Sequence, residues 1–132
     1  MTDKDGLSQI GQIAMRVRNL DRAVAFYRDS LGLRFLFEAP PQLAFFDCDG
    51  TRLMLNVPSE KEFDHPGSIL YFNVDDIEAA HGRLTARGVD FRAKPHMVAR
   101  LSDREVWMAF FNDNEGNVLA LMSEPPIEED TA

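Results

Sequence analysis

Residues 17–33 read Val-Arg-Asn-Leu-Asp-Arg-Ala-Val-Ala-Phe-Tyr-Arg-Asp-Ser-Leu-Gly-Leu, and a similar pattern returns at residues 74–89. In each segment a capping residue follows an apolar strand end, and a glycine closes the helical pattern. Asn19 suits the N-cap of the first helix, whereas Asp75, with Glu78 three residues later, makes a capping-box-like start to the second. The two segments therefore predict one helix in each half of the chain.

Strand-like runs surround the two predicted helices in the same order. They cover residues 10–17, 33–38, 42–48 and 51–57 in the first half, and residues 69–74, 89–98, 105–112 and 117–123 in the second. In addition, Asp49-Gly-Thr-Arg-Leu-Met-Leu parallels Glu115-Gly-Asn-Val-Leu-Ala-Leu. We therefore predict an α+β fold built from a duplicated β-α-β-β-β unit. The alternative is a coincidence between two common strand–helix patterns.

Length and composition fit one domain made of two short modules. The 132 residues carry 22 acidic against 14 basic side chains, which gives a formal net charge of −8. A chain of this size can bury roughly two-thirds of its surface. We assign residues 1–132 to a single domain, with module one at 9–57, a polar, proline-bounded linker at 58–66, module two at 67–123 and an acidic tail at 124–132.

Charge and cysteine content argue against several classes of function. A net charge of −8 with scattered basic residues opposes binding to nucleic acid or to anionic membranes. Cys48 is the only cysteine, which leaves no disulfide framework and no cysteine metal cluster. No apolar run reaches 18 residues, and the first residues lack a signal-peptide pattern, so we expect a cytoplasmic protein.

Alternation along the strands separates two faces of the predicted sheet. The consistently apolar series is expected under the helices, and it comprises Ile13, Met15, Val17, Leu53, Leu55, Val57, Leu70, Phe72, Val74, Leu119 and Leu121, together with Val106, Met108 and Phe110. The opposite face would then carry Gln12, Ala14, Arg16, Arg52, Met54, Asn56, Ile69, Tyr71, Asn73, His96, Glu105, Trp107, Ala109, Val118, Ala120 and Met122. Tyr71, Trp107 and Met54 make this second face too apolar for open solvent, and we interpret it as the wall of a ligand pocket. An ordinary solvent-facing sheet is the alternative.

These residues resemble the vicinal oxygen chelate superfamily, which includes glyoxalase I, bleomycin-resistance proteins, fosfomycin-resistance enzymes and extradiol dioxygenases. The resemblance covers residues 10–124. It rests on Gln12-Ile-Ala-Met-Arg-Val, on residues 19–33 and on Phe110-Phe-Asn-Asp-Asn-Glu-Gly-Asn-Val-Leu-Ala-Leu. It implies two β-α-β-β-β modules that form a curved mixed sheet around a cavity, and it implies a homodimer.

The resemblance also points to the positions at which metal-dependent members bind a divalent ion. Carried over to this sequence, these positions fall at Gln12, Met54, Ile69 and Ala120. Only Gln12 offers an oxygen donor, and one neutral amide is a weak anchor for such an ion. We therefore expect no metal at this site and no cofactor, while a divalent metal at a non-standard site stays open.

Two titratable residues are candidates for catalysis. His96 and Glu105 could act together, because an imidazole held by a carboxylate can move protons near neutral pH. The alternative pairs Glu105 with Arg100 across the hairpin and leaves His96 at a solvated strand edge. His65, in the linker, and His81, in the second helix, are expected at the surface.

Arg16 and Arg52 would need counter-charges if both point into a partly apolar pocket. The candidates are Glu105, Asp47 or an acidic group of a ligand. In glyoxalase I an arginine at the position matching Arg16 contacts an acidic group of the glutathione adduct, so the resemblance implies an anionic ligand group there. Internal pairing of both arginines is the alternative.

These observations favour a metal-independent small-molecule-binding protein of the bleomycin-resistance or glyoxalase-like type, with an amphipathic or aromatic ligand in the sheet cavity. A glyoxalase-like lyase or isomerase with an atypical or absent metal site is the alternative, so enzyme activity stays open; a sensor or partner-binding surface is a third possibility. The expected partners are the small molecule and a second copy of the chain, without nucleic acid or membrane. The expected ligand-binding residues are Gln12, Arg16, Phe45, Arg52, Met54, Asn56, Tyr71, Asn73, Trp107 and Ala120.

Overall fold

The computed structural model describes residues 6–39 and 41–127. The first module comprises β1 (Gln12–Arg16), α1 (Leu20–Ala25), the π-helical turn η1 (Phe26–Ser30), β2 (Arg34–Ala39), β3 (Leu43–Cys48) and β4 (Thr51–Asn56). The second comprises β5 (Leu70–Asn73), α2 (Ile77–Ala86), β6 (Asp90–Phe91), β7 (His96–Arg100), β8 (Glu105–Asn112) and β9 (Val118–Ser123), and the 3₁₀ turn η2 (Lys61–Phe63) lies between the modules. The β-α-β-β-β order recurs as predicted, but the strand predicted at 89–98 is divided into the short β6 and β7.

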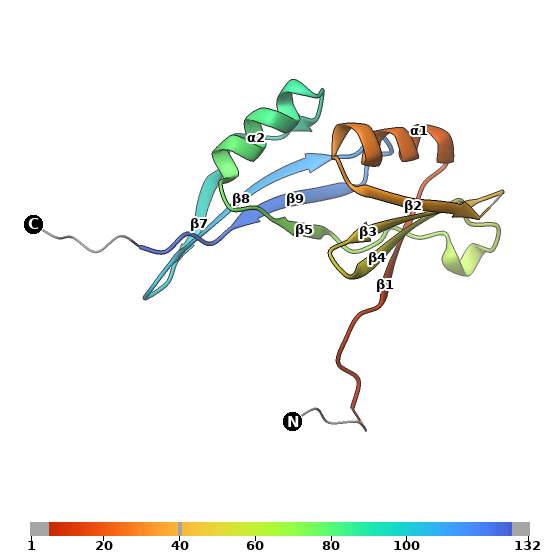
Figure 1. Cartoon of the computed structure of the whole chain (residues 1–132), viewed down its shortest axis with the longest axis horizontal. Helices are drawn as coiled ribbons and strands as arrows, with labels where there is room; N and C mark the ends of the chain where they lie inside the picture. The colour runs from red at the N-terminus through yellow and green to blue at the C-terminus, as the bar shows by residue number, and fades with distance from the viewer. Residues whose placement is uncertain (1–5, 40, 128–132) are drawn as a thin grey trace, which may run out of the picture.

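The strands form two sheets with the same internal order. Sheet A runs β1-β4-β3-β2, and sheet B runs β5-β9-β8, with β6 and β7 both paired to β8. In each sheet the first strand of the module lies parallel to the last, and the other neighbours are antiparallel. Both α1 and α2 lie on the same side of the two sheets (Figure 1). We call this the helix side, and the opposite side, which neither α1 nor α2 covers, the uncovered side.

Side-chain caps set the starts of the two helices. The Asn19 side chain accepts a hydrogen bond from the Arg22 amide at 3.1 Å and caps α1, as predicted. Asp76, and not the predicted Asp75, caps α2 by accepting from the Ala79 amide at 3.1 Å. The second helix therefore begins one residue later than the capping-box pattern predicts.

The hydrophobic core lies on the helix side of both sheets. The series predicted along β1, β4, β5 and β9 is confirmed: Met15, Val17, Leu53, Leu55, Leu119 and Leu121 are buried, and Ile13, Val57, Leu70, Phe72 and Val74 pack against them. The helical residues of the same core are Ala23, Val24, Tyr27, Ile77, Ala80 and Leu84.

The two faces of β8 are the reverse of the prediction. Ala109 and Phe111 are buried and pair in register with Leu121 and Leu119 of the core. The helix side of β8 therefore carries Trp107, Ala109 and Phe111, and the uncovered side carries Val106, Met108 and Phe110. Both series are apolar, so alternation within this strand cannot show which one is buried.

A buried carboxylate joins the two modules. Asp113, in the turn between β8 and β9, is 6% exposed and accepts a 2.6 Å hydrogen bond from the Tyr27 hydroxyl in η1. The same carboxylate accepts from the backbone amides of Glu115 and Asn117 at 2.8 Å and from the Asn117 side chain at 2.9 Å. The Asn117 side chain also donates to the carbonyl of Arg16. These bonds tie η1 and the end of β1 to the last turn of module two.

The two ends of the chain and the linker are described in part. Within residues 6–39 and 41–127, no helix is long and apolar enough to cross a membrane. The linker predicted at 58–66 contains η2. The acidic tail predicted at 124–132 is described only to residue 127, and residues 1–5 and 128–132 lie outside the described residues.

We expect Tyr27→Phe to lower the free energy of unfolding by about 1–3 kcal/mol, because it removes a donor from the buried Asp113 carboxylate. Urea denaturation followed by circular dichroism measures the change. Tyr71→Phe is the matched control: Tyr71 is 43% exposed, and its loss should cost less than about 0.5 kcal/mol. Equal losses in the two variants would contradict the importance of this hydrogen bond.

The same hydroxyl predicts a pH dependence of stability. Burial first, and then the charge of Asp113, raise the pKa of Tyr27 far above its usual value of about 10. Above about pH 10 the unfolded chain loses this proton while the folded protein keeps it. The stabilisation is therefore complete below that pH and falls above it by up to about 1.4 kcal/mol per pH unit. Denaturation between about pH 9 and 11 should show that the free energy of unfolding falls more steeply with pH for the wild type than for Tyr27→Phe. Parallel decreases in the two proteins would contradict a raised pKa of Tyr27.

Candidate functional site

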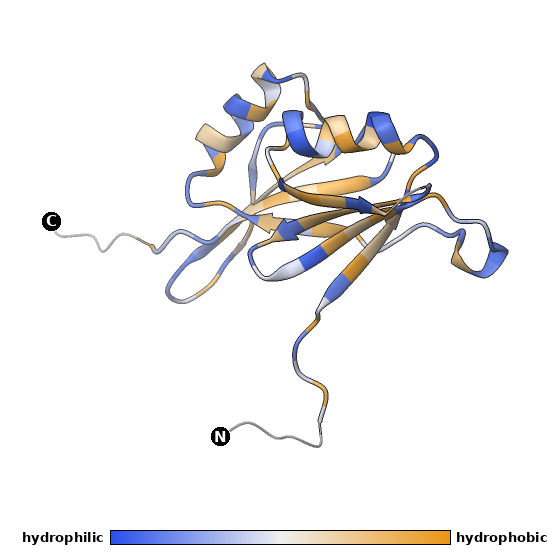
Figure 2. Cartoon of the chain, turned by 45° about the vertical axis from the view of Figure 1, so that its right-hand side comes forward, coloured by the Kyte–Doolittle hydropathy of each residue, from blue (hydrophilic) through white to orange (hydrophobic). Residues whose placement is uncertain are grey.

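Gln12, Phe45, Arg52 and Met54 gather on the uncovered side of sheet A. In register, Gln12 lies opposite Arg52, and Phe45 lies opposite Met54. Arg52 donates through Nε to Gln12 Oε1 at 2.9 Å, and its guanidinium carbon lies 5.2 Å from the centre of the Phe45 ring. Gln12 Nε2 lies 3.7 Å from Met54 Sδ. These four predicted residues are thus in contact, on strands along which hydrophilic and hydrophobic bands alternate (Figure 2).

A cavity of 420 Å³ lies between the uncovered side of sheet A and the linker. Its lining includes the predicted residues Arg16, Met54 and Asn56, and also Gln42, Leu43, Phe63 and His65. Arg16 Nη1 lies 2.8 Å from Asp64 Oδ1, with side-chain exposures of 28% and 43%. Arg16 therefore has an internal partner, as the alternative interpretation allows, but the partner is a linker residue that the sequence did not indicate.

A second cavity, of 850 Å³, lies between the β3–β4 hairpin of sheet A and β5 of sheet B. Arg52 lines it from one module, and Tyr71 and Asn73 line it from the other. The rings of Tyr71 and Phe110 meet edge to face, with centroids 5.8 Å apart. Predicted residues from both modules therefore line the same cavity. The side-chain contacts of Arg52, however, are with Gln12 and Phe45 of sheet A.

Trp107 does not lie on the face where the pocket interpretation placed it. Trp107 is on the helix side of β8, where its Nε1 donates to Glu105 at 3.0 Å beside the first residues of α2. Ala120 pairs with Tyr71 and Phe110 on the uncovered side, the face predicted for it, and is fully buried. Phe110 takes the aromatic position on the uncovered side, because the faces of β8 are reversed.

His96 and Glu105 lie on opposite sides of sheet B. His96 pairs with Met108 on the uncovered side, whereas Glu105 lies on the helix side with Trp107. Glu105 Oε2 accepts from Arg100 Nη1 at 3.0 Å, as the alternative interpretation expects. The two candidates therefore do not form an acid–base pair.

The donor set at the family's metal positions does not fit a divalent ion. Of Gln12, Met54, Ile69 and Ala120, only Gln12 has an oxygen donor, and its Oε1 accepts from the Arg52 guanidinium. A positive charge at the only oxygen opposes a second cation there. Across the described parts of the chain, no three His, Cys, Asp or Glu side chains are arranged to hold a metal ion.

Alternation along strands could not reveal the linker side of the first cavity. Phe63, Asp64 and His65 come from a segment without regular periodicity. His65, expected at the surface, is exposed but lines the cavity, with Nδ1 3.1 Å from the Pro66 carbonyl oxygen. Phe63 is an aromatic residue in an otherwise polar linker, and this was the sequence signal that could have indicated that the linker packs against the sheet.

Known proteins share this architecture. The family model described as the Glyoxalase/Bleomycin resistance protein/Dioxygenase superfamily matches residues 9–121. The uncharacterized protein YraH of Bacillus subtilis (strain 168) is 29% identical over 126 residues, which cover 83% of this chain and 94% of YraH.

Two solved structures illustrate the likeness in three dimensions. A lactoylglutathione lyase from Agrobacterium tumefaciens is 25% identical, with a TM-score of 0.71 over 89% of this chain and 95% of that chain. A glyoxalase/bleomycin resistance protein/dioxygenase superfamily member from Sphaerobacter thermophilus DSM 20745 is 24% identical, with a TM-score of 0.72 over 89% of this chain and 98% of that chain. With the repeated modules and the match over residues 9–121, the chain belongs to the Glyoxalase/Bleomycin resistance protein/Dioxygenase superfamily.

Proposed function

We propose that the protein binds an amphipathic or aromatic small molecule, without a metal ion, against the uncovered side of sheet A. The observation that carries the proposal is the 420 Å³ cavity between this side and the linker. Ligand sites are typically cavities of roughly 300–1,000 Å³ with apolar walls and a few polar groups. Leu43, Met54 and Phe63 supply the apolar wall here, and Arg16 and Asn56 supply polar groups.

The Arg16–Asp64 ion pair favours a ligand with an acidic group. Partly exposed pairs of this kind contribute only roughly 0–1 kcal/mol. A ligand carboxylate or phosphate could therefore replace Asp64 on the guanidinium at small cost. Replacement would also release the linker that Asp64 holds to β1, so ligand entry and linker movement are coupled in this proposal.

A glyoxalase-like lyase or isomerase is the alternative function. The lactoylglutathione lyase at 25% identity supports it. However, His96 and Glu105 lie on opposite sides of sheet B, and Gln12 is the only oxygen donor at the family's metal positions. This arrangement supports binding better than proton transfer.

The proposal also places the protein in the cytoplasm as a homodimer. Cys48 is half-buried and burial raises the pKa of its thiol, which suits a reducing compartment in which this residue stays a thiol. Phe37, Ile69 and Tyr71 are 43–46% exposed on the uncovered side, and exposed apolar side chains support a partner subunit there. Light scattering in solution would test the homodimer.

We expect Asp64→Asn to increase linker opening by about 2- to 5-fold, because it removes a pair that contributes up to about 1 kcal/mol. The measurement is the rate of limited tryptic cleavage after Lys61 in η2, which follows the open population. Asp29→Asn is the matched control, because it removes the same charge from the Arg28–Asp29 pair on η1. If both variants are cleaved at the wild-type rate, Asp64 does not hold the linker.

We expect Met54→Trp to weaken ligand binding at least about tenfold, because the larger ring would fill the cavity. The probe is 8-anilinonaphthalene-1-sulfonate, an aromatic amphipathic anion whose fluorescence rises in an apolar site. Met97→Trp is the matched control on β7 of sheet B, where Met97 is 45% exposed. Circular dichroism establishes that both variants are folded, and equal probe affinities in the two would place the ligand elsewhere.

A further inference from the structure

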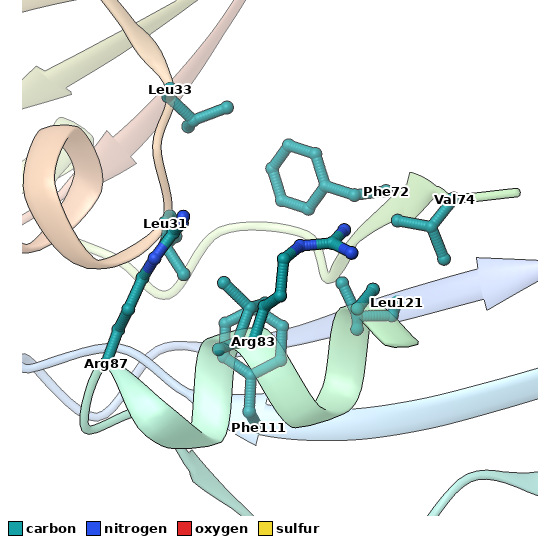
Figure 3. A pocket seen from close by; sticks show the side chains of 10 residues that line it. Leu31, Leu33, Phe72, Val74, Arg83, Arg87, Phe111 and Leu121 are labelled. Carbon is teal, nitrogen blue, oxygen red and sulfur yellow. The ribbon is translucent and has the colours of Figure 1, made fainter. Parts of the chain in front are cut away.

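A third cavity, of 180 Å³, lies on the helix side, between α2 and the segment that leads from η1 into β2; Leu33 and Phe72 line both it and the 850 Å³ cavity. Its apolar lining consists of Leu31, Leu33, Phe72, Val74, Leu84 and Leu121, with Ala80 and Phe111 (Figure 3). The lining comes from both modules. None of these residues lines the 420 Å³ cavity of the uncovered side.

Two arginines of the second module complete the lining. Arg83 lies in the last turn of α2, and Arg87, four residues later, is the C-cap residue of the helix. Figure 3 shows Arg83 extending toward Phe72 and Val74, and Arg87 extending toward Leu31. Arg87 Nη1 also lies 3.4 Å from the position that a Cβ would take at Gly32.

Within residues 6–39 and 41–127, neither guanidinium group takes part in an ion pair. Every ion pair among the described residues belongs to another arginine, namely Arg16, Arg28, Arg100 or Arg104. Two like charges beside one apolar cavity repel each other, and an anion between them would relieve that repulsion. Guanidinium groups are well suited to this role, because their planar fork matches a carboxylate.

We propose that this cavity is a second ligand site, which binds a small aromatic carboxylate. The size of the cavity supports the aromatic body, because an apolar protein cavity of about 150 Å³ is known to hold benzene. The 180 Å³ available here is therefore enough for one ring. The ring packs against the apolar lining, and the carboxylate faces Arg83 and Arg87 at the edge of α2.

Benzoate titrated into the full-length, isotope-labelled protein tests the proposal. We expect saturable NMR shifts of the amides of Leu31, Val74 and Leu84, which line the cavity. Benzamide, with the same ring and no charge, should bind at least about tenfold more weakly. The double variant Arg83→Gln/Arg87→Gln should weaken benzoate binding to a similar degree, because the ring would keep its cavity and lose its charge partners.

A matched control variant, together with the positions of the amides whose NMR signals shift, distinguishes this cavity from other binding sites. Arg18→Gln/Arg22→Gln removes the same charge near α1, away from this cavity, and should leave benzoate affinity unchanged. Equal binding of benzoate and benzamide, or equal weakening by the two double variants, would overturn the site. Shifts confined to Met54 and Asn56 would assign benzoate to the uncovered side, which would overturn this inference while supporting the proposed function.

Discussion

The hydrogen bond between Tyr27 and Asp113 is the constraint on which the two-module structure depends. Each module is one sheet with one short helix, too small to bury a secure core alone. A buried carboxylate costs free energy unless donors surround it, and the other module supplies one of them through Tyr27. The adjacent Glu115 carboxylate accepts from the amides of Arg18 and Asn19 at 2.9 Å, so the same turn also holds the start of α1. Among the described residues no buried side-chain nitrogen or oxygen lacks a partner, so the junction is a fully satisfied polar network.

This junction also reaches the uncovered side through a short series of bonds. Asn117 is held by Asp113 and donates to the carbonyl of Arg16, while the Arg16 side chain pairs with Asp64 in the linker. The end of β1 is therefore fixed from the buried side and holds the linker from the exposed side. Buried, fully bonded groups resist opening more than exposed pairs do. We therefore expect the linker to open while the junction between the modules stays closed.

The sequence predicted the fold well because each helix start and strand carries a local signal, and it predicted the faces only where the two series of a strand differ. On β1, Met15 is apolar and Arg16 is charged, so the face that carries Met15 had to be the one that packs in the core. On β8, Trp107 and Phe110 are both aromatic although they lie on opposite faces. Which face of β8 is buried therefore depends on the residues of β9 that lie opposite each of them. The Arg16–Asp64 contact joins residues 48 positions apart through a segment without periodicity, so the path of the linker had to be seen in three dimensions. The candidate site was therefore predicted on its sheet side and missed on its linker side.

The contacts that each arginine makes within the structure affect where this acidic protein can bind an anion. The sequence placed the local positive charge at Arg16 and Arg52, on the uncovered side. Arg16 lies in an ion pair, and Arg52 donates to Gln12 and stacks on an aromatic ring, so an anion there must first compete with existing contacts. Arg83 and Arg87, which the sequence analysis did not single out, have no ion-pair partner among the described residues. Salt screens charges beyond a Debye length of about 10 Å. The ion pairs of individual arginines therefore bear more directly on where an anion binds than the net charge of −8 does.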